Sequence, residues 1–241
     1  MKSESLLKVL TGAGTGSRRK MADAIKQERV AVNGQVVTDF RYPVNMETDR
    51  ISIDRKPVDL KPRQVVTLML NKPPGIISTV SDERGRGKVT DLLPEKYRSL
   101  RLYPVGRLDK DSTGLLLLTN DGELAYRLTH PRFEYEKEYL VHIKGKLKPE
   151  EKRKLARGLK LEDGMTHPAK VREVASSPPF NYSITIHEGR KRQVHRMFES
   201  LGHSVLALKR IRIGNLNLGN LSEGKTRELN AQEVRALLNQ A

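Results

Sequence analysis

Two carboxylates, Asp109 and Asp111, lie in a short polar segment of the 241-residue chain, directly before four consecutive leucines. A positioned aspartate can attack an electron-poor sugar carbon or stabilise positive charge beside it, as in glycoside chemistry. The leucines, residues 115–118, predict a strand that is buried on both faces and holds the acidic segment rigidly at the edge of a sheet. Aspartate and glycine are also common turn residues, and composition alone favours a simple turn.

Basic residues gather in a second segment, residues 186–213, which contains seven lysines and arginines against two acidic residues. On a helix, Arg192 and Arg196 would share one face, while Gln193 and Met197 would share the next. We therefore expect part of this helix to present charge and part to pack inward. A charged helix face is usually only solvated, so the pattern alone does not define a site.

A third group of charges, Arg18, Arg19 and Lys20, follows Ser17, which is a good N-cap for a helix. Three cations at a helix start oppose the helix dipole, an unfavourable arrangement unless an anion docks there. We interpret that anion as phosphate. The alternative is a solvated first turn.

The overall composition points to a nucleic-acid partner. Lysine and arginine number 45 against 29 acidic residues, giving a net charge of +16, and 37% of the residues are hydrophobic, enough for a folded core. The chain has no cysteine, its six histidines show no metal-ligand spacing, and no phosphate-binding glycine loop occurs. No segment is long and apolar enough to span a membrane or to form a signal peptide. We expect a cytoplasmic protein that needs no metal and contacts no membrane.

The elements that must carry these groups divide the chain into a small part, residues 1–60, and a larger part, residues 61–241. The small part reads as two helices and a hairpin, in which Asn33-Gly34 suits a type I′ turn. A closing strand at 51–53 precedes a charged, proline-marked linker at 55–63. The small part carries a net charge of +3, so most of the positive excess lies in the larger part.

The larger part is dominated by strand-like segments, and its helices do not alternate regularly with them. We therefore predict an α+β fold with a mixed, largely antiparallel sheet. The predicted strands are residues 65–71, 75–80, 101–105, 115–119, 135–144, 168–175, 181–187 and 204–213. The predicted helices are residues 121–130, 149–157, 190–201 and a terminal helix from Asn230, which has a capping-box partner in Glu233.

The run GRLDKDSTGLLLLTNDG at 106–122 resembles the central motif of the ribosomal RNA pseudouridine synthases of the RsuA/RluB type. Further motifs of that family are matched in the same order by KPPGIISTV at 72–80, EKEYLV at 136–141, EGRKRQVHRMFESLGH at 188–203 and LKRIRIG at 208–214. The first sixty residues resemble the S4 RNA-binding module that commonly precedes the catalytic domain in this family. The resemblance covers nearly the whole chain.

The resemblance implies isomerisation of uridine within ribosomal RNA, without cofactor or metal, and overall similarity favours large-subunit RNA. By position, Asp109 is the essential carboxylate, and Asp111 ranks lower because it falls on a variable position of the motif. Tyr139 matches a tyrosine that lies against the target base, and Arg107 belongs to the same substrate site. We expect a monomer.

The sequence departs from the family at His195, where a permanent cation usually pairs with the catalytic aspartate. Either His195, held charged by Asp109, or the adjacent Arg196 fills this role, and helix geometry favours His195. A milder departure is Ser112 in place of threonine, which keeps the hydroxyl. We assign Ser17, Arg18, Arg19, Lys20 and Arg192 to RNA binding.

Two rival functions are weighed against this interpretation. A non-catalytic RNA-binding or ribosome-assembly factor would explain the charge and the S4-like module, but not the long motif at 106–122. A glycosidase or nucleosidase using Asp109 and Asp111 would explain the paired carboxylates but would leave the net charge of +16 without a role.

Overall fold

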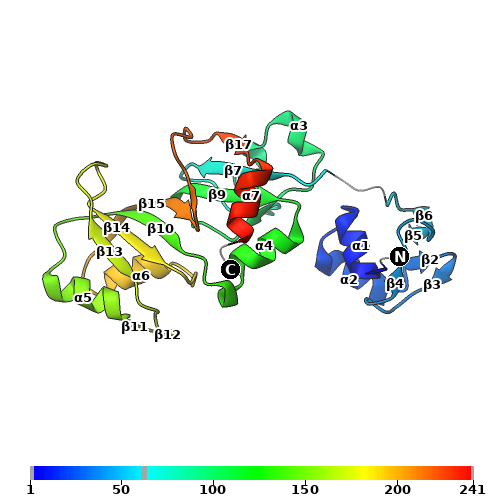
Figure 1. Cartoon of the computed structure of the whole chain (residues 1–241), viewed down its shortest axis with the longest axis horizontal. Helices are drawn as coiled ribbons and strands as arrows, with labels where there is room; N and C mark the ends of the chain where they lie inside the picture. Colours follow the sequence, from blue (N-terminus) through cyan, green and yellow to red (C-terminus); the bar gives the residue numbers. More distant parts are fainter. Residues whose placement is uncertain (1–2, 61–63, 240–241) are drawn as a thin grey trace. The chain divides into compact units, whose positions relative to one another are not determined.

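A computed structural model describes residues 3–60 and 64–239, and the chain divides into two compact units, Met1–Val65 and Val66–Ala241 (Figure 1). The predicted linker at 55–63 is wrong in its first part. There, β5 (Ile51–Ile53) and β6 (Lys56–Pro57) form a hairpin that belongs to the first unit. The remainder of the predicted linker, Lys61-Pro62-Arg63, lies outside the described residues.

The N-terminal unit is built from two helices and short strands, as the sequence predicts. Its elements are β1 (Glu4–Ser5), α1 (Leu6–Gly12), α2 (Arg18–Lys26), β2 (Val30–Val32), β3 (Gln35–Val36), β4 (Pro43–Val44), β5 and β6. Strands β3, β2, β5 and β6 form one sheet in that order. Apolar side chains of both helices and of this sheet share one core, which includes Leu10, Ile25 and Val30.

Two local predictions in this unit are confirmed. Asn33 and Gly34 have φ angles of 51° and 82°, the two positive values that a type I′ turn requires. Ser17 caps α2, since its side-chain oxygen accepts a hydrogen bond from the Lys20 amide at 3.0 Å. Short-range sequence signals therefore determine this unit well.

The larger unit is an α+β domain around a nine-stranded, largely antiparallel sheet, as predicted. The main path runs β13-β14-β10-β15-β9-β7-β17, and β8 and β16 pair at its sides. Among the described strands, only β9 and β15 pair in parallel. The strands of this sheet are β7 (Thr67–Lys72), β8 (Tyr103–Val105), β9 (Thr113–Thr119), β10 (Lys137–Ile143), β13 (Lys170–Glu173), β14 (Tyr182–Ile186), β15 (Val205–Ile213), β16 (Leu216–Asn217) and β17 (Thr226–Glu228). A separate hairpin is formed by β11 (Lys160–Leu161) and β12 (Gly164–Met165).

The helices of this unit follow their capping signals. The α-helices are α3 (Glu95–Arg98), α4 (Gly122–Thr129), α5 (Pro149–Arg157), α6 (Gln193–Glu199) and α7 (Ala231–Leu238), with 3₁₀ turns η1 (Val89–Leu92) and η2 (Pro131–Phe133). Asn230 and Glu233 form the predicted capping box of α7. Helix α6 begins three residues later than predicted, because Arg192 adopts a left-handed conformation.

The predicted strand at 75–80 is wrong. This segment bonds to loops instead: the amide of Gly75 donates to the Lys110 carbonyl, and the amide of Ile77 donates to the Gly87 carbonyl. Pro73 and Pro74 have no amide hydrogen to donate to a sheet ladder, so the chain leaves the sheet at the end of β7. The sequence also missed α3, the short hairpin of β11 and β12, and the edge strands β16 and β17.

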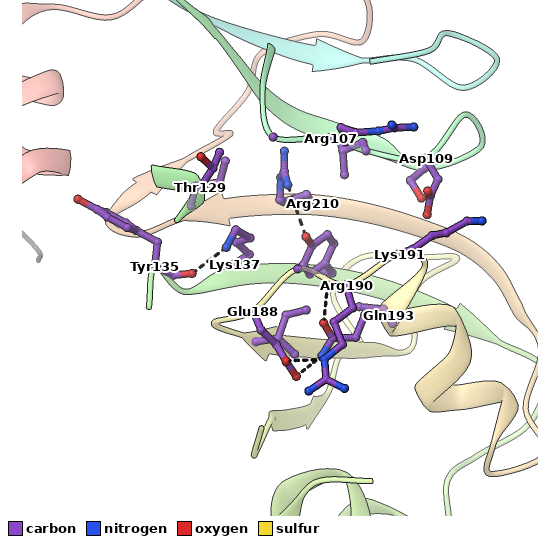
Figure 2. Close-up of a pocket in the computed structure, with 18 of the residues that line it drawn as sticks. Arg107, Asp109, Thr129, Tyr135, Lys137, Glu188, Arg190, Lys191, Gln193 and Arg210 are labelled. Atoms are coloured by element: carbon purple, nitrogen blue, oxygen red, sulfur yellow. Dashed lines mark hydrogen bonds and ion pairs between the residues drawn. The ribbon is translucent and has the colours of Figure 1, made fainter. Parts of the chain in front are cut away.

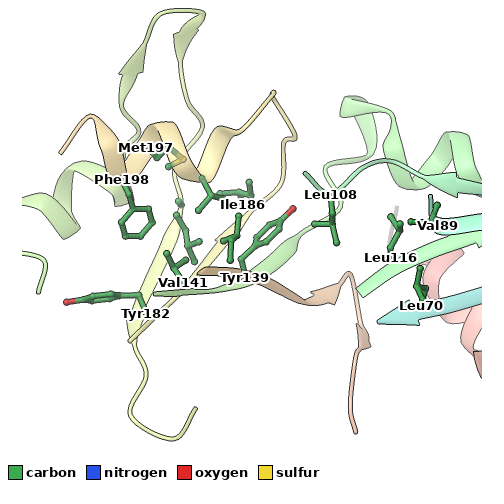
Figure 3. Close-up of a cluster of buried hydrophobic side chains, with 14 of the residues drawn as sticks. Leu70, Val89, Leu108, Leu116, Tyr139, Val141, Tyr182, Ile186, Met197 and Phe198 are labelled. Atoms are coloured by element: carbon green, nitrogen blue, oxygen red, sulfur yellow. The ribbon is translucent and has the colours of Figure 1, made fainter. Parts of the chain in front are cut away.

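Strand β9 separates two apolar cores, because its leucines alternate between its faces. Leu116 and Leu118 belong to a core shared with α6, whereas Leu115 and Leu117 belong to a core covered by α4 and α7. Figure 3 shows Leu116 beside Leu70 in the first of these cores, with Tyr139 and Met197 further along it. All four leucines are fully buried, which confirms the prediction of a strand covered on both faces.

Candidate active site

The larger unit contains a pocket of about 750 Å³ lined by five parts of the chain. These are the loop at 105–109 with Ser112, the strands β10 and β15, residues 128–131 at the end of α4, and the segment 186–195 that leads into α6. Figure 2 shows Asp109 on the loop at one end of the pocket, and Lys137 and Arg210 on the strands at the other end. Residues more than 100 positions apart in sequence therefore meet in one cavity.

The loop that carries Asp109 is fixed from below by a buried lysine. Lys72, at the end of β7, is 0% exposed and donates hydrogen bonds to the carbonyl oxygens of Pro73, Lys110 and Ser112 at 2.8 to 3.1 Å. Burial lowers the pKa of Lys72 to about 8, against the charges of Asp111 and Asp109, which raise it. The ammonium group of Lys72 therefore binds the carbonyls of Lys110 and Ser112, and these two hydrogen bonds fix the turn that follows Asp109.

Ser78 fixes the same loop through two hydrogen bonds to the backbone of Leu108. The Ser78 hydroxyl accepts a hydrogen bond from the amide of Leu108 at 3.1 Å and donates one to its carbonyl at 2.9 Å. The segment 75–80 therefore positions the residue next to Asp109 although it forms no strand. Asp109 is partly buried and lines the pocket, whereas Asp111 is exposed and does not. The two carboxylates thus do not act as a pair facing one cavity.

Tyr139 on β10 is 8% exposed and lines the pocket. Its hydroxyl accepts a hydrogen bond from Nη1 of Arg210 at 3.5 Å, a long contact across the neighbouring strand β15. Arg210 is 3% exposed, and its Nε donates to the Leu115 carbonyl at 2.7 Å. An aromatic ring and a buried cation therefore form part of the pocket floor.

His195 and Arg196 lie in different surroundings. His195 is buried, lines the pocket, and has its Nδ1 buried without a hydrogen-bond partner. Arg196 does not line the pocket, because its guanidinium pairs with Asp163 at 2.8 Å in the hairpin of β11 and β12. Helix α6 thus turns His195 toward the pocket and Arg196 toward the hairpin.

The expected charged pair of His195 and Asp109 is not what the structure contains. Burial, and next the charge of Arg192, lower the pKa of His195, and these effects outweigh the charge of Asp109, which raises it. The surroundings of His195 therefore disfavour its charged form. Among the described residues no cation lies within ion-pair distance of the Asp109 carboxylate.

The remaining predicted residues divide between the pocket rim and the other unit. Arg107 and Arg192 are exposed and line the pocket opening. Arg18, Arg19 and Lys20 are exposed on the first turn of α2, which contains no acidic residue. Gln193 and Met197 are buried, as the helix pattern predicted.

Sequence reasoning missed three cations of this region: Lys72 and Arg210, which are buried, and Lys137, which is half-buried. Each lies in a motif that was recognised, but at a position that composition cannot distinguish from a surface charge. A signal was available only for Lys137, which continues the alternating series of Tyr139, Val141 and Ile143 and therefore lies on the same face of its strand.

No helix among the described residues is long and apolar enough to cross a membrane.

A pocket that combines a carboxylate, an aromatic ring and several cations, in a chain of charge +16, defines the class as an enzyme that acts on nucleic acid. Residues 66–200 match the family of RNA pseudouridylate synthases, and residues 5–51 match the S4 domain. The chain belongs to the RNA pseudouridylate synthase family and is an isomerase with an N-terminal S4 RNA-binding domain.

Several relatives cover nearly the whole chain. Ribosomal large subunit pseudouridine synthase B of Bacillus subtilis (strain 168) is 46% identical over 237 residues, covering 97% of this chain and 95% of the relative. The protein of the same name from Vibrio cholerae is 43% identical over 225 residues, covering 90% and 68%. A crystal structure of a pseudouridylate synthase has a TM-score of 0.68 at 32% identity, covering 98% of this chain and 100% of that one.

Proposed function

We propose that this protein converts particular uridines of ribosomal RNA, in the large subunit, to pseudouridine, with Asp109 as the catalytic carboxylate. The observation that carries the proposal is the pocket itself, in which Asp109 lies on a loop fixed by Lys72 and Ser78 and shares one cavity with Tyr139. Large-subunit RNA is favoured because two relatives that span most of this chain are named for that substrate.

In the proposed reaction the N1–C1′ bond of the target uridine breaks, and its electron pair stays with the uracil ring. The Asp109 carboxylate acts at the electron-poor sugar, either as nucleophile at the sugar carbon or as base. The ring turns while bound against Tyr139, which replaces the stacking that a flipped base loses. A bond from C5 to C1′ then forms and displaces Asp109 where the carboxylate had acted as nucleophile; where it had acted as base, the sugar regains the proton it lost. The proton on C5 leaves to solvent, and N1 takes up a proton in its place, so the product is an isomer of the substrate.

Binding of the RNA is assigned to both units. Residues 1–60 anchor the RNA through phosphate contacts by Arg18, Arg19 and Lys20 at the start of α2, whose cap is Ser17. Residues 61–241 form the catalytic domain, where Arg107 and Arg192 meet the RNA at the pocket rim. The proposed site leaves out Arg196, because its guanidinium pairs with Asp163. His195 enters the site as a buried group that lines the pocket.

The chemical assignment is tested with Asp109→Asn, which keeps the size of the side chain and removes its charge. We expect RNA binding to survive and release of tritium from 5-tritiated uridine RNA to fall by at least about 1,000-fold. Asp111→Asn is the matched control, because Asp111 lies two residues away but outside the pocket, and its rate should stay within about threefold of the wild type. Near wild-type turnover in Asp109→Asn would show that another group carries the reaction.

The substrate is tested by mapping pseudouridine in both ribosomal RNAs of cells that lack this protein. We expect one or a few modifications of large-subunit RNA to disappear and to return when the gene is restored. A loss confined to small-subunit RNA would reject the proposed target while keeping the proposed reaction.

A further inference from the structure

The second half of the pocket contains two cations that the proposed reaction has not yet used, Lys137 and Arg210. They lie on neighbouring strands, β10 and β15, at the end of the pocket away from Asp109 (Figure 2). Lys137 is half-buried, and its Nζ donates to the Tyr135 carbonyl at 3.1 Å. Neither cation has a carboxylate partner among the described residues, so two positive charges face one pocket without a neutralising group.

A bulge in β15 aims Arg210 at the pocket. Arg212 pairs with Glu138 on β10, whereas Arg210 pairs with Tyr139, so one residue, Ile211, is left over between the two pairs. Adjacent residues of a strand face opposite sides of a sheet, and the bulge therefore sends the two arginines to opposite faces. Arg212 forms an ion pair with Glu138 at 2.9 Å on one face, while Arg210 donates to the Tyr139 hydroxyl on the other.

Arg210 has hydrogen-bonding capacity left over inside the pocket. Its Nε is used by the Leu115 carbonyl and its Nη1 by Tyr139, but its Nη2 is buried and has no partner. A buried donor of a charged group without an acceptor is costly, so such groups mark places where a ligand supplies the acceptor. Lys137 likewise has donors beyond the single carbonyl that it contacts.

We propose that Lys137 and Arg210 bind the carbonyl-oxygen edge of the target uracil and stabilise the negative charge that the ring carries while it is detached from the sugar. The inference rests on the proposed function. When the N1–C1′ bond breaks, the electron pair remains on the ring and delocalises onto its oxygens, and Asp109 meets the positive charge on the sugar. Carboxylate and cations thus stand at opposite ends of the bond that breaks.

The position of Tyr139 favours the uracil ring over a phosphate as the group that these cations bind. Tyr139 lines the same pocket and its hydroxyl accepts a hydrogen bond from Arg210, so a ring stacked on the tyrosine brings an edge close to Arg210. A backbone phosphate carries a sugar on each side and fits the exposed cations Lys191 and Arg192 at the rim better. Fixed donors in an enclosed site act strongly on charge that develops during reaction.

The test uses single-turnover tritium release from 5-tritiated uridine RNA with Arg210→Met, Lys137→Met and the conservative variants Arg210→Lys and Lys137→Arg. We expect the maximal rate to fall by about 100-fold or more in each Met variant, with half-saturating RNA changed by less than about threefold, and a partial return in the conservative variants. Arg212→Met, the other arginine of the bulge, is the matched control and should keep the wild-type rate.

The pH profile provides a readout that a structural role would not change. Burial, and next the charge of Arg210, lower the pKa of Lys137 to about 8. The other titratable groups in this part of the pocket are Tyr135, Tyr139, His130, His187 and Glu188. The wild-type rate should fall as the pH rises through 8 and Lys137 loses its proton, and Lys137→Arg should weaken that fall. Lys72 is present in both proteins, so the comparison isolates Lys137.

Three results would overturn the inference. The first is a rate within about threefold of the wild type in both Met variants, and the second is an unchanged pH profile in Lys137→Arg. The third is weaker binding with a reduced salt dependence and a normal maximal rate, which would identify a phosphate contact. A wild-type protein that releases no tritium would instead reject the proposed function, so the two failures are distinguishable.

Discussion

The cations at the start of α2 in the N-terminal unit and those inside the larger unit lie in opposite environments. Arg18 and Arg19 are exposed in the N-terminal unit, whereas Lys72 and Arg210 are 0% and 3% exposed in the larger unit. Exposed charges act at a distance, tolerate imprecise geometry and are screened by salt. Buried charges keep a fixed position and act strongly over a few ångströms. Affinity for RNA and chemistry on one nucleotide therefore use different electrostatic environments, and mutations should separate them.

The largest effect is expected from Gly114→Ala, which would break the packing that the buried charges need. Gly114 has a φ of 98°, and a Cβ atom there would lie 2.2 Å from the carbonyl oxygen of Arg210, on the paired strand β15. The atoms it would meet belong to the backbone of β15, which cannot move aside as the end of a flexible side chain can. We expect the free energy of unfolding to fall by about 3 kcal/mol, measured by urea denaturation, and turnover to be lost.

Gly34→Ala is the matched control in the N-terminal unit. Gly34 also has a positive φ, 82°, but nothing lies within 4 Å of the added Cβ. Only the backbone strain remains, about 1 kcal/mol, and turnover should persist. If the two substitutions cost the same, the close contact of β9 and β15 is not what makes the larger unit sensitive.

A smaller effect is expected when the exposed charges are removed. Arg18→Ala with Arg19→Ala should weaken binding to all structured RNAs and reduce the slope of log affinity against log salt by roughly 0.7 to 0.9 for each lost contact. The choice of uridine should not change, because the catalytic pocket is untouched. Binding measured from low to moderate salt checks this, and an unchanged slope would show that these cations do not meet phosphate.

The smallest effect is expected at His195, where the structure changes the prediction from sequence. Because burial lowers the pKa of His195 and so disfavours its charged form, His195→Gln should keep single-turnover activity at pH 7 within a few-fold of the wild type. Below pH 6.5 the unfolded chain takes up a proton that the folded chain does not. The wild type should therefore lose stability relative to His195→Gln as the pH falls. A large loss of activity in His195→Gln at pH 7 would show that the charged form is needed.

Local signals made much of the fold predictable. The type I′ turn at Asn33, the cap at Ser17, the capping box at Asn230 and the four leucines of β9 all depend on residues a few positions apart. Helix α5 has the predicted bounds because Pro149 can occupy only the first turn of a helix. The resemblance to the family motifs also predicts that Asp109 and Tyr139 belong to one site, although they are 30 positions apart in the sequence.

Features that depend on partner strands could not be predicted. The bulge at Ile211 exists only relative to the register with β10, so nothing in the segment itself tells which of Arg210 and Arg212 faces the pocket. The lowered pKa of His195 depends on burial by distant residues, which sequence spacing does not report. The sequence predicts a strand at 75–80 because this segment contains Ile76, Ile77 and Val80, but in the structure Ile76 packs against the core from outside the sheet and Val80 is exposed.

The division of the leucines of β9 between two cores has a consequence for the way the larger unit opens. If the side chains of one core separated, leucines of β9 would be exposed while the other core still required β9 in place, so the two cores should unfold together. The strand and the loop that precedes it thus belong to one cooperative unit, and amides of Leu115 to Leu118 should exchange with solvent only through global unfolding. The N-terminal unit has a separate core and can open independently, while the geometry around Asp109 lasts as long as the domain is folded.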